Sequence, residues 1–488
     1  MSCKLIFEQG AAGRRCTRYA ETDAPDGNIE KHIPRNLLRN KAAGLPEVSE
    51  LEIVRHFTNL SRMNFSVDSH FYPLGSCTMK YNPKINEDTA SLEGFTGLHP
   101  YQPYSTTQGI LQLLFETEQM LKEMTGMSRF TLQPAAGAHG ELLGMMLVRA
   151  YHDKKGNHRK KVLVPDSSHG TNPASAVVSG YDVVTIKSNE YGEVDIETLK
   201  AAMDEHVAAL MMTNPNTLGL FERNVKEIQK VVHEYDAVLY YDGANLNALL
   251  GVARPGDMGF DIVHINLHKT FSTPHGAGGP GSGPIGVSKK LVTFLPVPLI
   301  RFEGNMYKLD YNLPDSVGKV KNFYGQIGII IRAYTYMRLL GKEGLIKTSE
   351  AAILNANYLL AKLKKHFTLP YSDRCMHEFV VSASNTKEYG ASALDIAKSL
   401  LDKGFHAPTT YFPLIVPEAL MVEPTETETK ETLDAFAKAI EEILEQAKRE
   451  PGSLHDAPRT MPVTRMDDVA AARNPILRWK PGTEHNSN

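Results

Sequence analysis

The sequence predicts an α/β fold, with a large domain built on a mostly parallel sheet flanked by helices and a smaller α+β domain after it. One observation behind this is that short apolar segments, which suit strands, alternate with segments whose apolar residues recur at helical spacing. The other is that Thr213, Asp242 and Lys269 stand at the ends of three of the apolar segments. Ligands bind beyond the carboxyl ends of the strands in such sheets, so this second observation also predicts a binding site.

The strands of the large domain are expected where runs of apolar and β-branched residues occur. They are residues 130–132, 162–164, 183–186, 208–212, 237–241 and 262–267. Helices are expected between them, at residues 141–151, 196–206 and 225–233. An earlier helix ends at Gly126, because glycine commonly terminates helices, and its core face is formed by Ile110, Leu114, Leu121 and Met124.

The chain is expected to have four regions. They are an N-terminal arm at 1–95, a large cofactor-binding domain at 96–340, a small C-terminal domain at 341–450 and a tail at 451–488. A long helical segment at 326–366, broken near Gly341, leads into the small domain. There we expect strands at 378–382 and 420–423 and an amphipathic helix at 433–444 that closes the core.

Composition excludes several classes of protein. A chain of 488 residues with a net charge of −3 gives no reason to expect nucleic acid or an anionic membrane as a partner. Four cysteines in so long a chain form no disulfide framework, which fits a reducing cytoplasm. The N-terminus lacks the apolar stretch of a signal peptide, and no apolar run approaches the ~20 residues that span a bilayer.

Lys269 and Asp242 form the most informative pair. A lysine alone at a strand end is usually a solvated surface residue, and an Asp-Gly pair usually marks a turn. Together, at neighbouring strand ends, they are what an aldehyde cofactor of the pyridoxal phosphate type requires. The lysine amine holds the aldehyde as a Schiff base, and the carboxylate keeps the pyridine nitrogen protonated so that the ring accepts electrons.

Three further segments at strand ends suit such a cofactor. The turn containing Gly137 and Ala138 has small side chains and opens a helix, which favours a phosphate, although such a turn is often only a tight connection. His169 could stack on a cofactor ring or be an ordinary loop histidine. Thr213 could donate a hydrogen bond to the cofactor's phenolic oxygen, or could simply begin a turn.

Competing motifs do not meet their structural requirements. Residues 276–281 match the dinucleotide pattern GxGxxG, but prolines interrupt the segment and an apolar strand follows where a helix is required. His264 and His268 have the spacing of zinc ligands on a helix. In a strand, at ~3.3 Å per residue, they would stand about 13 Å apart and could not bind one ion. We therefore expect no metal site.

The sequence resembles glycine decarboxylase, the P-protein of the glycine cleavage system, from about residue 50 to residue 450. The chain is similar to the C-terminal, lysine-bearing half of the single-chain enzyme, and its opening LIFE resembles the start of subunit 2 of the two-subunit form. The segments that carry the resemblance are PLGSCTMK at 73–80, QPAAGAHG at 133–140, HGTNPASA at 169–176, DGANLN at 242–247, NLHKT at 266–270 and MVEPTE at 421–426.

The resemblance implies pyridoxal phosphate fold type I and assigns roles to individual residues. Lys269 would be the Schiff-base lysine, Asp242 the partner of the pyridinium, and His169 would stack on the ring with Ala244 beneath it. The residues around the phosphate would be Gly137, Ala138, Asn266 and His268.

The resemblance also implies a reaction and partners. Glycine would lose CO2, and its aminomethyl group would pass to the lipoyl arm of the H-protein. A second, homologous subunit would complete the enzyme as a heterotetramer with two copies of each chain. Another reaction on the same scaffold, without a lipoyl acceptor, and a scaffold subunit with no chemistry remain as alternatives. Lys269 and Asp242 argue against a scaffold subunit.

No residue is fixed by the sequence as the ligand of the substrate. Arg301 and Arg332 are generic candidates for a partner of the glycine carboxylate. Five residues in the family-like segments before the sheet could fold over the site, although each could equally serve packing: His70, Ser76, Thr78, Lys80 and His99.

Overall fold

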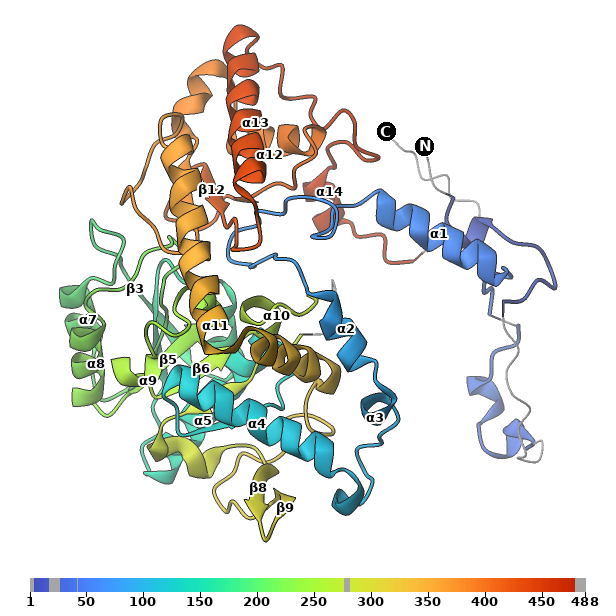
Figure 1. Ribbon diagram of the computed structural model, residues 1–488, viewed down its shortest axis with the longest axis vertical. Coiled ribbons are helices and arrows are strands. Elements are labelled where there is room, and N and C mark those ends of the chain that lie inside the picture. The colour runs from blue at the N-terminus through green and yellow to red at the C-terminus, as the bar shows by residue number, and fades with distance from the viewer. Residues whose placement is uncertain (1–3, 17–26, 42, 276–280, 479–488) are drawn as a thin grey trace. The chain divides into compact units, whose positions relative to one another are not determined.

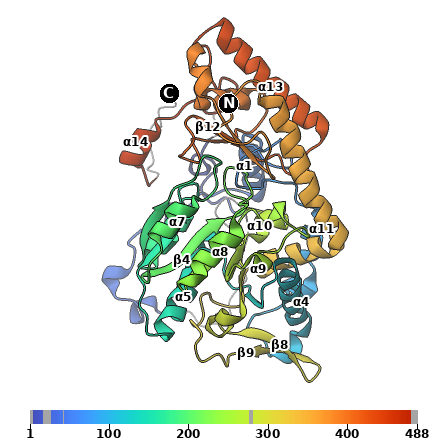
Figure 2. The same cartoon turned by 90° about the vertical axis from the view of Figure 1, so that its left-hand side faces the viewer.

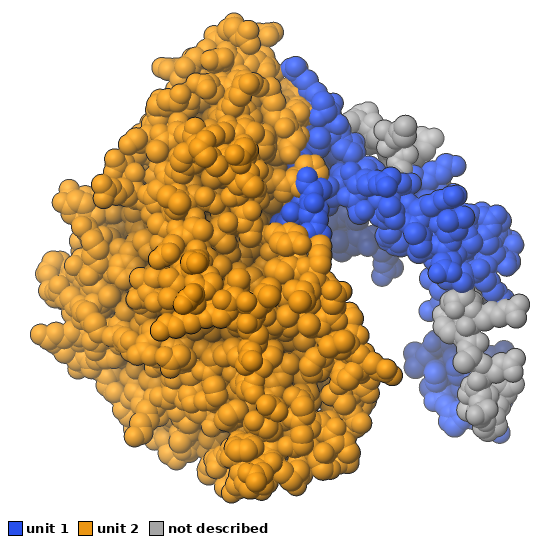
Figure 3. Space-filling view, in the orientation of Figure 1, with its two compact units in different colours: residues 1–69, 458–488 blue, residues 70–457 orange. Residues whose placement is uncertain are grey.

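The computed structural model describes residues 4–16, 27–41, 43–275 and 281–478. The chain divides into two compact units, one formed by residues 1–69 with 458–488 and the other by residues 70–457 (Figure 3). In the first unit, helix α1 (Glu50–Arg62) begins at a capping box, in which Ser49 and Glu52 exchange hydrogen bonds with each other's backbone N–H groups. A short helix, α14 (Asp468–Arg473), lies in the same unit.

The second unit contains a seven-stranded sheet in the order β1-β7-β6-β5-β4-β2-β3 (Figure 1). All strands run parallel except β7, which is antiparallel to both of its neighbours. The strands are β1 (Arg129–Thr131), β2 (Lys161–Pro165), β3 (Asp182–Ile186), β4 (Val207–Thr213), β5 (Val238–Gly243), β6 (Ile262–Ile265) and β7 (Ile285–Val287).

Helices cover both faces of this sheet (Figure 2). Alternate residues of a strand point to opposite faces, so Leu239 packs in one core cluster with Ile228 while Tyr240 packs in another with Leu143. The helices around the sheet are α4 (Gln108–Thr125), α5 (Gly137–Lys154), α6 (Thr171–Val178), α7 (Ile196–Ala202), α8 (Val225–Glu234), α9 (Pro255–Met258) and α10 (Leu267–Thr270). Helices α2 (Lys84–Ala90) and α3 (Glu93–Thr96) precede α4, and a ribbon of β8 (Leu299–Glu303) and β9 (Met306–Asp310) follows β7.

A second core forms around a three-stranded antiparallel sheet in the order β10-β12-β11. The elements that build it are β10 (Phe379–Ser382), α12 (Ala393–Asp402), β11 (Thr409–Thr410), β12 (Ala419–Val422) and α13 (Lys430–Arg449).

Helix α11 (Ile327–Leu363) is a long helix that extends from the large sheet to the second core (Figure 1). Ile330 is buried in the core of the large sheet and Leu359 in the second core. Its helical geometry is interrupted at Gly341, whose φ of 60° and ψ of −172° are accessible essentially only to glycine. The break that the sequence predicted near Gly341 is therefore present.

The predicted strands and the predicted alternation with helices are confirmed. Apart from small shifts at the ends of elements, there is one error. The expected strand 262–267 stops at Ile265, and residues 267–270 form the single helical turn α10, so His268 does not lie on a strand. The GxGxxG match lies almost entirely outside the described residues, but the strand expected after it is β7. The proposed domain boundaries stay a prediction. No helix within the described ranges is long and apolar enough to cross a membrane.

Candidate active site

A cavity of about 180 Å³ lies at the carboxyl ends of the parallel strands. Ten of the residues predicted from the sequence line it: Ser76, Gly137, Ala138, His169, Thr213, Asp242, Ala244, Asn266, His268 and Lys269. Three residues that the sequence did not single out line it as well: Glu141, Thr171 and Thr217.

The register of the strands explains why these side chains meet. Thr213 at the end of β4 pairs with Asp242 on β5, and Asp242 pairs with His264 on β6. Lys269 follows β6 on the turn α10, which begins after Asn266. Residues that are far apart in the sequence therefore stand side by side at one edge of the sheet.

Asp242 is buried and its carboxylate has several hydrogen-bond partners. Its Oδ1 accepts the N–H of Ala244 at 3.0 Å, and its Oδ2 accepts the amide of Asn172 at 3.1 Å and the hydroxyl of Thr213 at 3.3 Å. Burial alone would raise the pKa of Asp242, but His264, the Ala244 N–H and Lys269 outweigh it and hold that pKa below its ordinary value. Asp242 is therefore an ionised carboxylate.

His264 supports Asp242 from the neighbouring strand, with its Nε2 3.3 Å from Oδ1. Its other ring nitrogen, Nδ1, lies 2.7 Å from the hydroxyl of Tyr240. Burial raises the pKa of Tyr240 well above its ordinary value, so this hydroxyl stays protonated and donates a hydrogen bond to Nδ1. The Nε2–H of His264 is then left to donate to Asp242.

Lys269 is half-buried, and its ammonium donates a hydrogen bond to the backbone carbonyl of Ser76 at 2.6 Å. Ser76 lies before the sheet, within the region 1–95 that the sequence predicted as an arm, and this part of the region therefore folds over the strand ends. The predicted contact of Thr213 with a cofactor oxygen stays a prediction, because in this structure its hydroxyl donates to Asp242.

The N-terminus of α5 forms the anion-binding end of the cavity. Within the part of the chain that the structure describes, no side chain caps this 18-residue helix, so the N–H groups of its first turn, which includes Gly137 and Ala138, can bind an anion. A Cβ at Gly137 would lie 2.5 Å from Oδ1 of Asn266, so only glycine allows this close approach. The Asn266 Oδ1 and the Ser282 hydroxyl are buried without a hydrogen-bond partner among the described residues. The N–H groups of the first turn of α5 and the Ser282 hydroxyl can donate to a phosphate, whereas the Asn266 Oδ1 can only accept.

His169 and Glu141 lie on the side of the cavity formed by α5 and α6. The ring of His169 is exposed, and its Nδ1 lies 2.9 Å from the hydroxyl of Thr171, which donates to Glu141 at 2.8 Å. Burial, reinforced by the charge of Asp242, raises the pKa of Glu141. Its position one helical turn after Gly137 was the sequence signal that could have identified it.

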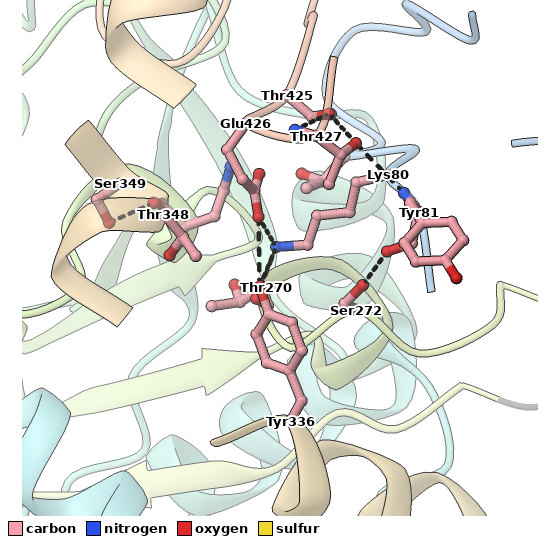
Figure 4. A network of polar contacts seen from close by, with 12 residues as sticks. Lys80, Tyr81, Thr270, Ser272, Tyr336, Thr348, Ser349, Thr425, Glu426 and Thr427 are labelled. Atoms are coloured by element: carbon pink, nitrogen blue, oxygen red, sulfur yellow. Dashed lines mark hydrogen bonds and ion pairs between the residues drawn. The ribbon is translucent and has the colours of Figure 1, made fainter. Parts of the chain in front are cut away.

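The five residues suggested for the substrate do not all meet at the cavity. Ser76 lines it, whereas Thr78 is buried and bonded to Glu423. Lys80 is buried in a separate hydrogen-bond network with Glu426 (Figure 4). His70 and His99 do not line it. Of the two arginines considered, Arg332 donates to Glu87 at 2.6 and 2.9 Å, and Arg301 pairs with Asp310.

A larger hollow of about 990 Å³ lies elsewhere, between α4 and α11. It is lined by side chains such as Met120, Met124, Met337 and Leu345, and none of the residues at the strand ends faces it. Size alone would favour this hollow, but the convergent polar groups identify the smaller cavity as the candidate active site.

Comparisons with known proteins agree with the resemblance read from the motifs. Residues 22–305 match the family model of the glycine cleavage system P-protein, and residues 348–459 match that of the glycine dehydrogenase C-terminal domain. The chain is 58% identical over 476 residues to a probable glycine dehydrogenase (decarboxylating) subunit 2 of Caldanaerobacter subterraneus, covering 97% of this chain and 98% of that protein. A protein of the same name from Listeria monocytogenes is 56% identical over 477 residues, which are 98% of each chain.

Solved structures give the same fold. A glycine decarboxylase (P-protein) in inhibitor-bound form matches with a TM-score of 0.72 at 20% identity, covering 85% of this chain and 94% of that one. Lactobacillus brevis glutamate decarboxylase matches with a TM-score of 0.63 at 13% identity, covering 87% and 97%. The predicted α/β fold of type I is thus confirmed, and so is the resemblance. The chain belongs to the glycine cleavage system P-protein family.

Proposed function

We propose that this chain is the lysine-bearing subunit of a glycine decarboxylase that depends on pyridoxal 5'-phosphate. The observation that carries the proposal is one cavity that contains a lysine amine, an ionised carboxylate and an uncapped helix N-terminus. These are the three groups needed to bind an aldehyde, a pyridinium nitrogen and a phosphate. The names of the relatives, which are glycine dehydrogenases (decarboxylating), support glycine as the substrate.

The residues present fit this cofactor. The phosphate would bind at the first turn of α5, near Asn266 and His268, and the ring would lie between His169 and Ala244 with its nitrogen toward Asp242. Burial, with the charges of His275 and Lys269, lowers the pKa of His268 to about 3, so its ring is neutral. When bound, pyridoxal phosphate supplies a protonated ring that takes up the electron pair released with CO2.

The side chains of this chain prepare and protect that chemistry. Asp242 stays ionised because His264 and the Ala244 N–H stabilise its charge, and it therefore keeps a ring nitrogen protonated. With the cofactor bound, Lys269 would hold the aldehyde in one state and would be a free amine in the other. The carbonyl of Ser76 gives the free ammonium a hydrogen-bond partner in that second state.

The overall reaction balances without a further reagent. The bond between the glycine α-carbon and its carboxyl group breaks, and the carboxyl group leaves as CO2. The electron pair left on the carbon forms a bond to one sulfur of the lipoyl disulfide of the H-protein. The other sulfur takes up the electrons of the broken S–S bond together with a proton and becomes a thiol.

We also propose an obligate complex with a homologous subunit 1, as a heterotetramer with two copies of each chain, that acts with the H-protein in the cytoplasm. Helix α1 supports this, because it presents a row of exposed apolar side chains at every third position. They are Leu51, Val54, Phe57 and Leu60. A helix with such an unpaired face normally packs on another protein surface. The name "subunit 2" borne by the relatives points the same way.

The proposal is tested with the purified chain, alone and mixed with the second subunit. The mixture should be yellow, and borohydride should abolish the visible band and leave a reduced adduct on Lys269. It should also exchange the glycine carboxyl group with bicarbonate, and Lys269→Ala should not. An adduct on another lysine would overturn the assignment of Lys269, and full turnover of glycine without a lipoyl acceptor would favour a different decarboxylase.

A further inference from the structure

The loop of residues 74–80 has a strained backbone next to Lys269. Ser76 and Thr78 both adopt positive φ angles, of 63° and 51°, although neither is glycine. Each such residue costs on the order of 1 kcal/mol or more, so the surrounding structure must hold the loop in place.

Two buried glutamates accept the hydrogen bonds of this loop. The N–H of Ser76 donates to Oε2 of Glu378 at 2.6 Å. The N–H of Thr78 donates to Oε2 of Glu423 at 2.7 Å, and its hydroxyl donates to Oε1 at 2.6 Å. The two strained residues are thus the two residues whose N–H groups these carboxyls bind.

The pairing of β10 with β12 places these glutamates side by side. Phe379 is opposite Val422, so the preceding Glu378 and the following Glu423 continue the same antiparallel register. Leu74 forms an isolated bridge with Val422, which brings the loop to the same end of the sheet. The glutamates therefore come from the second core, while Lys269 comes from the first.

The held loop presents a single acceptor to Lys269. The carbonyl of Ser76 accepts a hydrogen bond from the Lys269 ammonium at 2.6 Å. We propose that Glu378 and Glu423 are positioning residues for Lys269, which hold the 74–80 loop so that the Ser76 carbonyl binds the free lysine amine. The inference rests on the proposed function only in taking Lys269 as the lysine that must be released and received again.

The charges around the loop are consistent with one shared negative charge. Burial raises the pKa of Glu378 well above its ordinary value, and the neighbouring Glu423 raises it further. Burial also raises the pKa of Glu423, but the Thr78 hydroxyl and N–H oppose this effect. Two adjacent buried carboxylates repel each other, so the pair favours one shared proton and one negative charge near Lys269. The adjacent His377 is neutral, because burial lowers its pKa to about 3.

A divalent cation is the other occupant that this cluster could hold. The ligand atoms of His377, Glu378 and Glu423 lie within 4.8 Å of one another, and both ring nitrogens of His377 lack a hydrogen-bond partner among the described residues. However, the carboxylates already accept backbone and side-chain donors from the loop, from Asn245 and from Asn247. These donors already occupy the carboxylate oxygens, which argues against a metal ion between them.

The test compares an amide with an alanine at position 378. Glu378→Gln keeps an acceptor for Ser76 and matches the charge of a protonated carboxyl, whereas Glu378→Ala removes the acceptor. In the complex with the second subunit, Glu378→Gln should keep the visible band of the bound cofactor and most of the glycine–bicarbonate exchange. Glu378→Ala should shift the band and slow the exchange at least about tenfold. This is the effect expected when the Lys269 ammonium loses its charge-assisted hydrogen bond to the Ser76 carbonyl.

A second readout does not depend on the cofactor or on activity. In the cofactor-free chain, acetylation of Lys269 by acetic anhydride, read by peptide mass spectrometry, should become faster in Glu378→Ala and in Glu423→Ala, because the amine loses its partner. The exposed Lys154 serves as the internal reference. Glu222→Gln and Glu222→Ala are matched controls, because Glu222 is also buried, binds a backbone N–H and has a pKa raised by burial to about 7.

Each outcome supports or overturns the inference. Unchanged acetylation of Lys269 and an unchanged visible band in a folded Glu378→Ala protein would overturn it, and so would equal changes in the Glu222 controls. One equivalent of a divalent metal in the purified protein, lost in Glu378→Gln, would show that the cluster binds a metal ion and would overturn the inference. If the wild-type complex shows no exchange but acetylation behaves as expected, the proposed function fails and the positioning role stands.

Discussion

Replacing Lys80 by methionine should destabilise the protein by about 3–5 kcal/mol, the usual cost of leaving one partner of a buried ion pair uncompensated. The Lys80 side chain is only 1% exposed, and its ammonium donates to Glu426 at 2.7 Å, to the Thr270 carbonyl at 3.0 Å and to the Tyr336 hydroxyl at 3.4 Å (Figure 4). Burial alone would lower the pKa of Lys80, but Glu426 outweighs it and raises that pKa. Lys80 is thus a charged group inside the protein.

The magnitude depends on what remains around Glu426. Its side chain is 8% exposed, and its Oε2 has no hydrogen-bond partner among the described residues, so Lys80 is the charge that compensates it. Lys80→Met should therefore be more harmful than the double variant Lys80→Met/Glu426→Gln, which leaves no charge behind and should regain about 2 kcal/mol. The exposed pair of Lys430 and Asp434 provides the control, and Lys430→Met should cost less than about 1 kcal/mol.

The assay is urea unfolding of the cofactor-free chain, since bound cofactor would add its own stabilisation. The m value rises with protein size and should exceed the ~1–3 kcal/mol per molar urea of small proteins, so the midpoint should fall by roughly 1 M for the single variant. A loss below about 1 kcal/mol, or a double variant no more stable than the single one, would refute the assignment of a buried, mutually compensating pair.

Three further changes test other parts of the structure. Asp242→Asn removes the charge that keeps a ring nitrogen protonated, so glycine–bicarbonate exchange should slow by about two orders of magnitude or more. Near-normal exchange in that variant would remove Asp242 from the mechanism. Phe57→Asp on the exposed face of α1 should weaken binding of the second subunit at least about tenfold in size-exclusion titrations, with unchanged circular dichroism. Full activity of the chain without a partner would contradict this. Burial lowers the pKa of His152 from 6.5 to about 4, so the unfolded chain binds more protons between these values and stability is lost as the pH falls from 6.5 to 4. His152→Gln should reduce that acid-induced loss by about 3 kcal/mol, and an unchanged pH profile of unfolding would show that His152 is not the group responsible.

The large sheet could be predicted because its strands are apolar on both faces and are separated by amphipathic helices. The end of β6 could not. Apolar and polar residues alternate from Val263 to Leu267, across the end of β6 and the start of α10. A four-residue helix is too short for its period to be distinguished from that of a strand. The antiparallel position of β7 depends on pairing between distant segments, which local pattern does not reveal.

In the candidate site, too, some residues could be predicted from the sequence and others could not. Asp242, Lys269 and Thr213 were predicted because polar residues at the carboxyl ends of parallel strands meet at one edge of the sheet. Glu378 and Glu423 were missed, because their partners in the 74–80 loop lie some 300 residues away in sequence. What identifies them is the register of β10 on β12 together with the course of the loop, and neither can be read from spacing.

The interruption of α11 at Gly341 allows this residue to affect the geometry around Lys269, which it does not contact. The segment of α11 after it, residues 342–363, is roughly 33 Å long at 1.5 Å per residue, so a change of about 5° in the bend would move its far end by about 3 Å. That segment is embedded in the core that supplies Glu378 and Glu423, whereas Lys269 belongs to the other core. A hydrogen bond of 2.6 Å between Ser76 and Lys269 tolerates only a small fraction of such a displacement. The position of the Lys269 amine is therefore sensitive to the backbone angles at Gly341, and substitutions along α11 can shift this amine without altering any residue of the cavity.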